Sequence, residues 1–283
     1  MPPSVVGTGA LATSAGGGTT PALPTGLAVN DILIMHVASM PSGEVPSVAD
    51  AAGGTWTFVG PFSGSQSNSG VRGTWIWSRY NGTQTAPTLG ATSVAQYSRI
   101  TAVRGCITTG DPYIQDGLAP TFAETVSAIT SVTTAVDDCL ILDCICGNGP
   151  DADGTGVYTG WTNATLTGAA DVYNDSSSVG PGASMAMRAA TKATAGATGT
   201  TSAIAHANFH VAYKKLALLP PIAITSGVLA ATLDAVTLEA MTGLAGFGIA
   251  AITLDAIVAL ATAWTPVTGG NPWMIRLEVE ELP

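Results

Sequence analysis

Charge is the scarcest property of this sequence. Asp, Glu, Lys and Arg make up 10% of its 283 residues, whereas globular proteins carry about 25%. Small neutral residues such as glycine, alanine, threonine and serine must therefore cover most of the surface. A freely diffusing enzyme normally keeps a charged surface for solubility. The composition favours a subunit whose faces are covered by neighbouring subunits, with an ordinary extracellular β-protein as the alternative.

Basic side chains are particularly few. The chain has nine Lys and Arg residues against 19 Asp and Glu residues, which gives a net charge of −10. The basic residues are scattered along the chain: Arg72, Arg79, Arg99, Arg104, Arg188, Lys192, Lys214, Lys215 and Arg276. No patch of them could neutralise a row of phosphates. We therefore expect no nucleic-acid partner.

The motifs of the common enzyme classes are missing. The sequence has no Gly-x-Ser-x-Gly elbow, no Gly-x-x-x-x-Gly-Lys phosphate loop and no Gly-x-Gly-x-x-Gly between a strand and a helix. Asp137, Asp138 and Asp143 are the carboxylates from which a glycosidase pair could form. Such acids usually occupy turns in β-proteins. We therefore expect no catalytic activity and no cofactor.

Metal-ligand patterns are equally weak. His206 and His210 are four residues apart, but their segment reads as a strand and lacks the Glu of a metalloprotease motif. Asp151 and Asp153 resemble the start of a calcium loop, yet a third oxygen ligand and the terminal Glu are missing. We interpret these residues as parts of a sheet and of a solvated acidic turn, and we expect no bound metal.

The four cysteines are too clustered for a zinc site. They are Cys106, Cys139, Cys144 and Cys146. The alternation of a strand would place Cys144 and Cys146 on one face and Cys139 on the other. A zinc site usually takes two separated pairs, and no second pair follows. We expect buried free thiols that act as small apolar side chains, with a disulfide as the alternative.

Export and membrane signals are also missing. The N-terminal residues have neither a basic region nor a continuous apolar run, so we expect no secretory signal and synthesis in a cytoplasm. The most apolar stretch, near the C-terminus, is interrupted by Asp234, Glu239 and Asp255 and follows Pro220-Pro221. A membrane-spanning helix needs about 20 consecutive apolar residues, so we expect none.

Residues 1–217 alternate short apolar runs with clusters of Gly, Ser, Thr, Asn, Asp and Pro. This texture is typical of antiparallel β-sandwiches and jelly rolls. The clearest predicted strands are 31–38, 55–59, 72–80, 95–103, 138–146, 183–189 and 203–213. The predicted fold class is all-β, with an antiparallel jelly-roll-like β-sandwich over residues 1–217.

Two of these strands resemble each other. Asn30-Asp31-Ile-Leu-Ile-Met-His and Asp137-Asp138-Cys-Leu-Ile-Leu-Asp both pass from an acidic turn into apolar residues. Trp56 follows the first strand and Trp161 follows the second. The pattern predicts two similar half-sandwiches that face each other, as in a jelly roll made of two Greek keys. The alternative is that apolar strands are simply alike.

The texture changes after Pro220-Pro221. Residues 227–240 and 248–261 share the pattern Thr-Leu-Asp-Ala, which recurs after 21 residues. A unit of this size cannot bury its apolar face alone, and two copies are fewer than a solenoid needs. Residues 218–283 are therefore predicted to form a small C-terminal assembly domain that packs against other chains, with strands favoured over helices. Its predicted interface residues are Leu229, Leu233, Val236, Leu238, Ile252, Leu254, Ile257, Trp264 and Trp273.

Tryptophans suggest a second kind of contact. Trp75 and Trp77 would share one face of a strand, and flat indoles can stack on sugar rings. A glycan platform is therefore a hypothesis for this pair, with the loop 63–70 at its tip. Packing in a core or an interface is the alternative. The other four tryptophans are Trp56, Trp161, Trp264 and Trp273.

Several of these segments together resemble a known class of proteins. In order they are Asn-Asp-Ile-Leu-Ile-Met-His-Val-Ala, Gly-Gly-Thr-Trp-Thr-Phe-Val-Gly, Trp-Ile-Trp-Ser-Arg-Tyr and Asp-Asp-Cys-Leu-Ile-Leu. This succession resembles the jelly-roll domains of tailed-bacteriophage virion proteins. The cassette Gly-Val-Leu-Ala-Ala-Thr-Leu-Asp-Ala-Val-Thr-Leu and its looser second copy resemble repeats in phage head and tail accessory proteins.

The resemblance implies a structural component of a virion. An external capsid decoration (cement) or accessory protein is the first expectation, as a homo-oligomer bound to major capsid or tail proteins, and a trimer would match that location. The acidic net charge of −10 suits the outside of a DNA-filled shell. A tail or fibre module that binds a host-surface glycan or receptor is the alternative.

Overall fold

The computed structural model describes residues 2–40, 45–50, 52–64, 70–91, 95–115 and 123–221. Within these ranges the regular structure consists of β-strands, with no α-helix. The all-β, antiparallel prediction is therefore confirmed for the described part of the chain. The predicted assembly residues, from Leu229 to Trp273, lie outside it.

The first half of the chain forms a six-stranded sheet with the order β1-β8-β3-β6-β5, and β2 also pairs with β8. All of its strand pairs are antiparallel. Its strands are β1 (Ser4–Thr8), β2 (Ala12–Ala15), β3 (Ile32–Met40), β5 (Thr57–Gly64), β6 (Arg72–Arg79) and β8 (Ala95–Arg104). A small second pair joins β4 (Val48–Ala49) to β7 (Thr88–Leu89).

The second half forms a seven-stranded sheet with the order β10-β17-β12-β15-β14-β13, and β9 also pairs with β17. Its strands are β9 (Tyr113–Gln115), β10 (Ala123–Ile129), β12 (Cys139–Gly147), β13 (Gly154–Thr155), β14 (Thr167–Ser177), β15 (Ala183–Lys192) and β17 (Thr201–Leu218). Here too a small pair lies apart, between β11 (Thr133–Thr134) and β16 (Gly196–Ala197).

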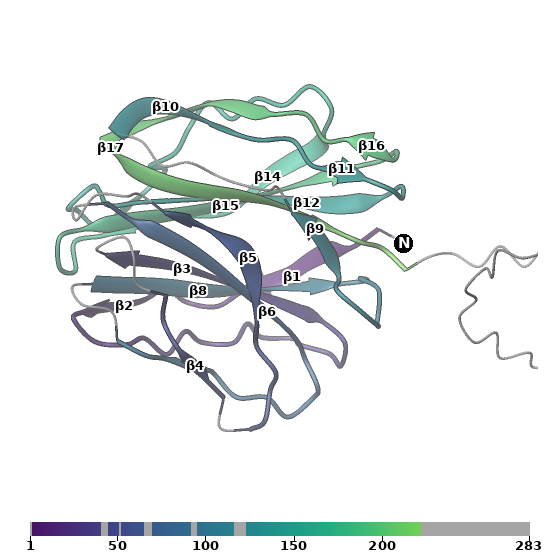
Figure 1. Ribbon diagram of the computed structural model, residues 1–283, viewed down its shortest axis with the longest axis horizontal. Coiled ribbons are helices and arrows are strands. Elements are labelled where there is room, and N and C mark those ends of the chain that lie inside the picture. Colours follow the sequence, from purple (N-terminus) through teal and green to yellow (C-terminus); the bar gives the residue numbers. More distant parts are fainter. Residues whose placement is uncertain are drawn as a thin grey trace, which may run out of the picture. The chain divides into compact units, whose positions relative to one another are not determined.

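The two sheets pack face to face, as the two layers in Figure 1 show. Their shared core combines side chains of β3, β6 and β8 with those of β12, β15 and β17. Separate apolar clusters cover the outer faces, where residues between the strands fold back over each sheet. As a result β3 and β12 are buried at every position, which explains why both read as continuous apolar runs.

The second sheet repeats the strand order of the first. In each sheet two short strands form one edge: β1 and β2 lie along β8, and β9 and β10 lie along β17. Each of these long strands then pairs with a central strand, which is β3 in one sheet and β12 in the other. The central strand pairs in turn with a hairpin, formed by β5 and β6 in the first sheet and by β14 and β15 in the second. The described chain is thus built from one topology used twice.

The register of the two copies agrees as well. Val5 and Ile32 pair with the same residue of β8, and Tyr113 and Leu140 pair with the same residue of β17. Val5 and Tyr113 are 108 positions apart, and so are Ile32 and Leu140. Ile32 and Leu140 also face the shared core, so the shift preserves which face of the strand is buried.

The structure confirms the resemblance between the two halves and corrects its details. The predicted alignment placed Asp31 opposite Asp138, a shift one residue shorter than the observed one, and a slip of one residue exchanges the two faces of a strand. Each half also forms one whole sheet, so consecutive strands do not alternate between the layers as they do in a jelly roll. The seven predicted strands are all present, as β3, β5, β6, β8, β12, β15 and β17.

The cysteine prediction is confirmed. All four cysteines are free and buried. Cys144 and Cys146 face the shared core, whereas Cys139 belongs to an apolar cluster on the outer face of the second sheet.

Candidate functional site

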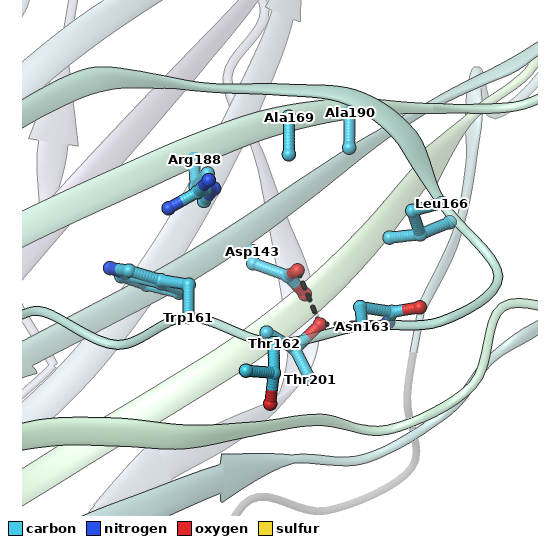
Figure 2. A pocket seen from close by; sticks show the side chains of 9 residues that line it. All are labelled: Asp143, Trp161, Thr162, Asn163, Leu166, Ala169, Arg188, Ala190 and Thr201. Atoms are coloured by element: carbon cyan, nitrogen blue, oxygen red, sulfur yellow. Dashed lines mark hydrogen bonds between the residues drawn. The ribbon is translucent and has the colours of Figure 1, made fainter.

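A cleft opens on the outer face of the second sheet (Figure 2). Its volume is about 380 Å³, including the part open to solvent. Nine residues line it: Asp143, Trp161, Thr162, Asn163, Leu166, Ala169, Arg188, Ala190 and Thr201. Asp143 of β12 and Arg188 of β15 are cross-strand partners, so the floor of the cleft carries one acid and one base side by side.

Asp143 is buried, and an ion pair with Lys215 balances its negative charge. Its carboxylate lies 3.5 Å from the ammonium of Lys215, which is itself fully buried. The Thr201 hydroxyl donates a 2.6 Å hydrogen bond to the same carboxylate. Lys215 also donates to the carbonyl oxygen of Gly199 at 2.7 Å. A buried ion pair of this kind is tolerated only when further hydrogen bonds support it, and the contacts fix Asp143 at the base of the cleft.

Arg188 is the side chain with unused hydrogen-bonding capacity. Its guanidinium is 27% exposed and lies 3.6 Å from the carboxylate of Asp171, which is 50% exposed. The guanidinium carbon of Arg188 lies 6.0 Å from the ring centre of Trp161. It forms no hydrogen bond with any other described residue, so the N–H donors of its guanidinium can reach a ligand in the cleft.

The wall next to Arg188 is held rigidly. The Trp161 indole N–H donates to the Tyr158 carbonyl at 3.3 Å, which fixes the ring. Asn163 donates to the carbonyl oxygen of Thr198 at 3.1 Å and accepts from the Thr165 amide at 2.9 Å. These contacts use up the polar groups of Asn163, so it shapes the wall and Trp161 supplies its flat surface.

The equivalent place in the first sheet is filled with apolar side chains. Where β12 and β15 pair Asp143 with Arg188, β3 and β6 pair Met35 with Ile76. Met35 and Ile76 are completely buried in an apolar cluster against which Trp56 packs. Both copies therefore place a tryptophan near this strand pair, but only the second copy combines it with an acid and a base.

Trp75 and Trp77 do not form the hypothesised glycan platform. They share one face of β6, as predicted, but that face is turned toward the other sheet, and Trp75 is 0% exposed. Trp77 packs edge-on against Tyr113, with 6.1 Å between ring centres. A fully buried indole presents no surface to a sugar, which corrects the hypothesis for this pair. The loop 65–69 lies outside the described residues.

A polar cluster occupies the shared core beside Trp75. His36 stacks on Trp75 with 5.0 Å between ring centres, and its Nδ1 lies 2.9 Å from the Tyr173 hydroxyl. Burial lowers the pKa of His36 to about 3, so the imidazole is neutral at ordinary pH. The Lys214 ammonium lies 5.6 Å from the centre of the Trp75 ring. Lys214 and Lys215 are consecutive and therefore point to opposite faces of β17.

The other predicted acids and histidines stay apart from the cleft. Asp137 accepts the amide of Ala195, and Asp153 accepts the amide and hydroxyl of Ser178, which lowers the pKa of Asp153. His206 is buried with its Nε2 2.9 Å from the Ser127 hydroxyl. Within the described ranges no group of three or more His, Cys, Asp or Glu side chains could hold a metal ion.

Comparisons with family models, with curated proteins and with solved structures gave no match. In the part of the chain that the structure describes, no helix is long and apolar enough to cross a membrane. From the sequence, Asp143 was a candidate carboxylate and Trp161 a counterpart of Trp56, whereas Arg188 was only one of the scattered basic residues and was not predicted to lie in a site. The signal that could have marked the cleft is an acid in the middle of the apolar run Cys139–Cys146.

Proposed function

We propose that this chain is a structural protein of a bacteriophage virion, with external capsid decoration or an accessory role as its task. The observation that carries the proposal is the burial of its basic side chains. Of the eight Lys and Arg residues in the described part, only Arg104 is exposed, and it pairs with Asp31 at 2.7 Å. The other seven are buried or half-buried, so the described surface carries little positive charge.

The exposed carboxylates outnumber that single exposed cation. They belong to Asp111, Asp137, Asp138, Asp151, Asp153 and Asp171. Such a surface does not attract the phosphates of packaged DNA, which supports a position on the outer side of a particle. A protein with few surface charges also gains when neighbours cover its neutral faces.

An open sheet edge supports assembly with neighbours. β14 is the edge strand of the second sheet, and β13 covers only its end, at Asp175 and Ser176. Residues 167–171 of β14 are exposed and read Thr-Gly-Ala-Ala-Asp. Only Asp171, at the end of this stretch, is charged, and an edge with so few charges accepts a strand from another chain by backbone hydrogen bonding. Together with the predicted assembly repeats, it supports a homo-oligomer that docks on other virion proteins, with a trimer as the proposed symmetry.

Cryo-electron microscopy of the particles made from the genome that encodes this chain tests the proposal. We expect density for the two-sheet body at regular positions on the outside of the head. Density at the tail tip would instead favour the receptor-binding alternative. Particles that contain no copy of the chain, by mass spectrometry of the purified virion, would overturn the virion role.

A further inference from the structure

We propose that the cleft between Trp161 and Arg188 binds a neutral saccharide. In this site one pyranose ring lies against the Trp161 indole, its hydroxyl oxygens accept hydrogen bonds from Arg188, and its hydroxyl groups donate to Asp171, the exposed ion-pair partner of Arg188. The inference does not depend on the virion role, because it rests only on the geometry of the second sheet.

The difference between the two copies of the topology indicates that the cleft is a functional site. The first copy fills the position with Met35 and Ile76, which are fully buried. The second copy places Asp143 and Arg188 there and compensates the acid with Lys215. Charged side chains in a sheet are a poorer choice for stability than apolar ones of similar size. A departure from good packing at one site of a well-packed fold is typical of a functional site.

The donors and surfaces in the cleft match the chemistry of a sugar. The Arg188 guanidinium is partly exposed and forms no hydrogen bond with the described residues, so it can donate to hydroxyl oxygens. The Asp171 carboxylate, 50% exposed, accepts hydrogen bonds from hydroxyl groups. The indole and the methyl groups of Ala169 and Ala190 give an apolar surface for the C–H face of a ring. A sugar presents both kinds of surface at once.

The charge balance favours a neutral ligand over an anionic one. Arg188 and Lys215 are matched by Asp143 and Asp171, so the site has no excess charge. The whole chain carries −10, and a field of that sign lowers the local concentration of anions. The volume of about 380 Å³ includes the part of the cleft that is open to solvent, so a bound sugar would keep one side exposed.

The experiment uses the full chain and an array of neutral oligosaccharides built from glucose, galactose or mannose. Hits are then titrated in solution by isothermal calorimetry. We expect binding of at least one neutral glycan and a loss of affinity of at least tenfold in Trp161→Ala. The matched control is Trp56→Ala, which removes the corresponding tryptophan of the first copy and should leave affinity unchanged.

A second variant protects the test against misfolding. Asp171→Asn changes a half-exposed side chain and keeps its size, so the melting temperature should stay close to that of the parent while affinity falls several-fold. The proposal is overturned if no neutral glycan binds at millimolar concentration, if only acidic glycans bind, or if both Trp161→Ala and Asp171→Asn bind as well as the parent.

Discussion

Asn30 and Asp138 lie 108 positions apart and hold the same left-handed backbone conformation, with φ angles of 73° and 57°. Each stands at the entrance to the central strand of its sheet. The amide of Asn30 donates to the Tyr80 carbonyl at 2.9 Å, and the amide of Asp138 donates to the Ala193 carbonyl at 3.2 Å. Both residues thus hold the start of the central strand to the end of the neighbouring one. Asn and Asp tolerate this conformation better than other side chains because they are short and polar.

Replacement of either residue by alanine should therefore have the same effect. A left-handed alanine costs about 1 to 2 kcal/mol, so we expect Asn30→Ala and Asp138→Ala each to lower the free energy of unfolding by about 1 kcal/mol. Glycine at the same positions should restore most of the loss. Urea denaturation measures both, and Val29→Ala, at an exposed neighbouring position, is the control. A cost at only one of the two sites would contradict their equivalence.

The central strands were predictable because they are long, apolar and bounded by turns. Their register was not, since β3 and β12 are buried on both faces and show no alternation that distinguishes the faces. The predicted shift between the halves was therefore wrong by one residue. β14 was missed because residues 167–171 are mostly small and lie exposed without an alternating apolar face. The strand is held in the sheet by its pairing with β15, which sequence patterns do not reveal.

The candidate site depends even more on long-range contacts. Asp143 and Arg188 become neighbours only through the pairing of β12 with β15, and Trp161 reaches them from the connection before β14. The sequence made Trp75 and Trp77 more conspicuous because they lie close together in the chain. Alternation correctly placed them on one face, but it does not indicate which face of a strand meets the second sheet.

The buried imidazole should make the fold sensitive to acid. Burial holds the pKa of His36 at about 3 in the folded protein, against 6.5 without burial. Between these values the unfolded chain binds a proton that the folded protein does not, so stability falls as the pH is lowered from about 6.5 toward 3, by up to about 1.4 kcal/mol per pH unit. Guanidinium denaturation at pH 7, 6, 5 and 4 measures the slope.

His36→Phe removes that proton and keeps an aromatic ring against Trp75. The variant should lose stability at pH 7, because the contact with the Tyr173 hydroxyl is gone, but its stability should fall less steeply between pH 6 and pH 4. Equal slopes for the two proteins would show that His36 does not titrate as its burial requires.

Removing only one partner of the ion pair between Asp143 and Lys215 should destabilise the protein more than removing both. Lys215→Met leaves the Asp143 charge buried without its ammonium, and we expect a loss of about 3 to 5 kcal/mol in the free energy of unfolding. The double variant with Asp143→Leu should recover most of that loss. Asp171→Ala breaks the exposed pair with Arg188 and should cost less than about 1 kcal/mol. A double variant no more stable than Lys215→Met would contradict this view of the pair.

The thiols should be inert until the protein unfolds. Burial raises the pKa of Cys106 to about 12 and also raises the pKa values of Cys139 and Cys146. Only the thiolate reacts, so at pH 8 we expect no reaction with Ellman's reagent in buffer over an hour. In denaturant all four cysteines should react. Rapid release of one equivalent from the native protein would show that a thiol is accessible.

The repeated topology also determines how the described part of the chain is held together. The backbone passes from one sheet to the other only once, between Arg104 and Tyr113. Among the described strands no backbone hydrogen-bond ladder joins the two sheets, so the sheets are held together mainly by the contact of their inner side chains. A peptide-bond break in that single connection would leave two fragments, each with its complete set of paired strands. The intact backbone there acts as a tether that keeps two self-contained layers at high effective concentration.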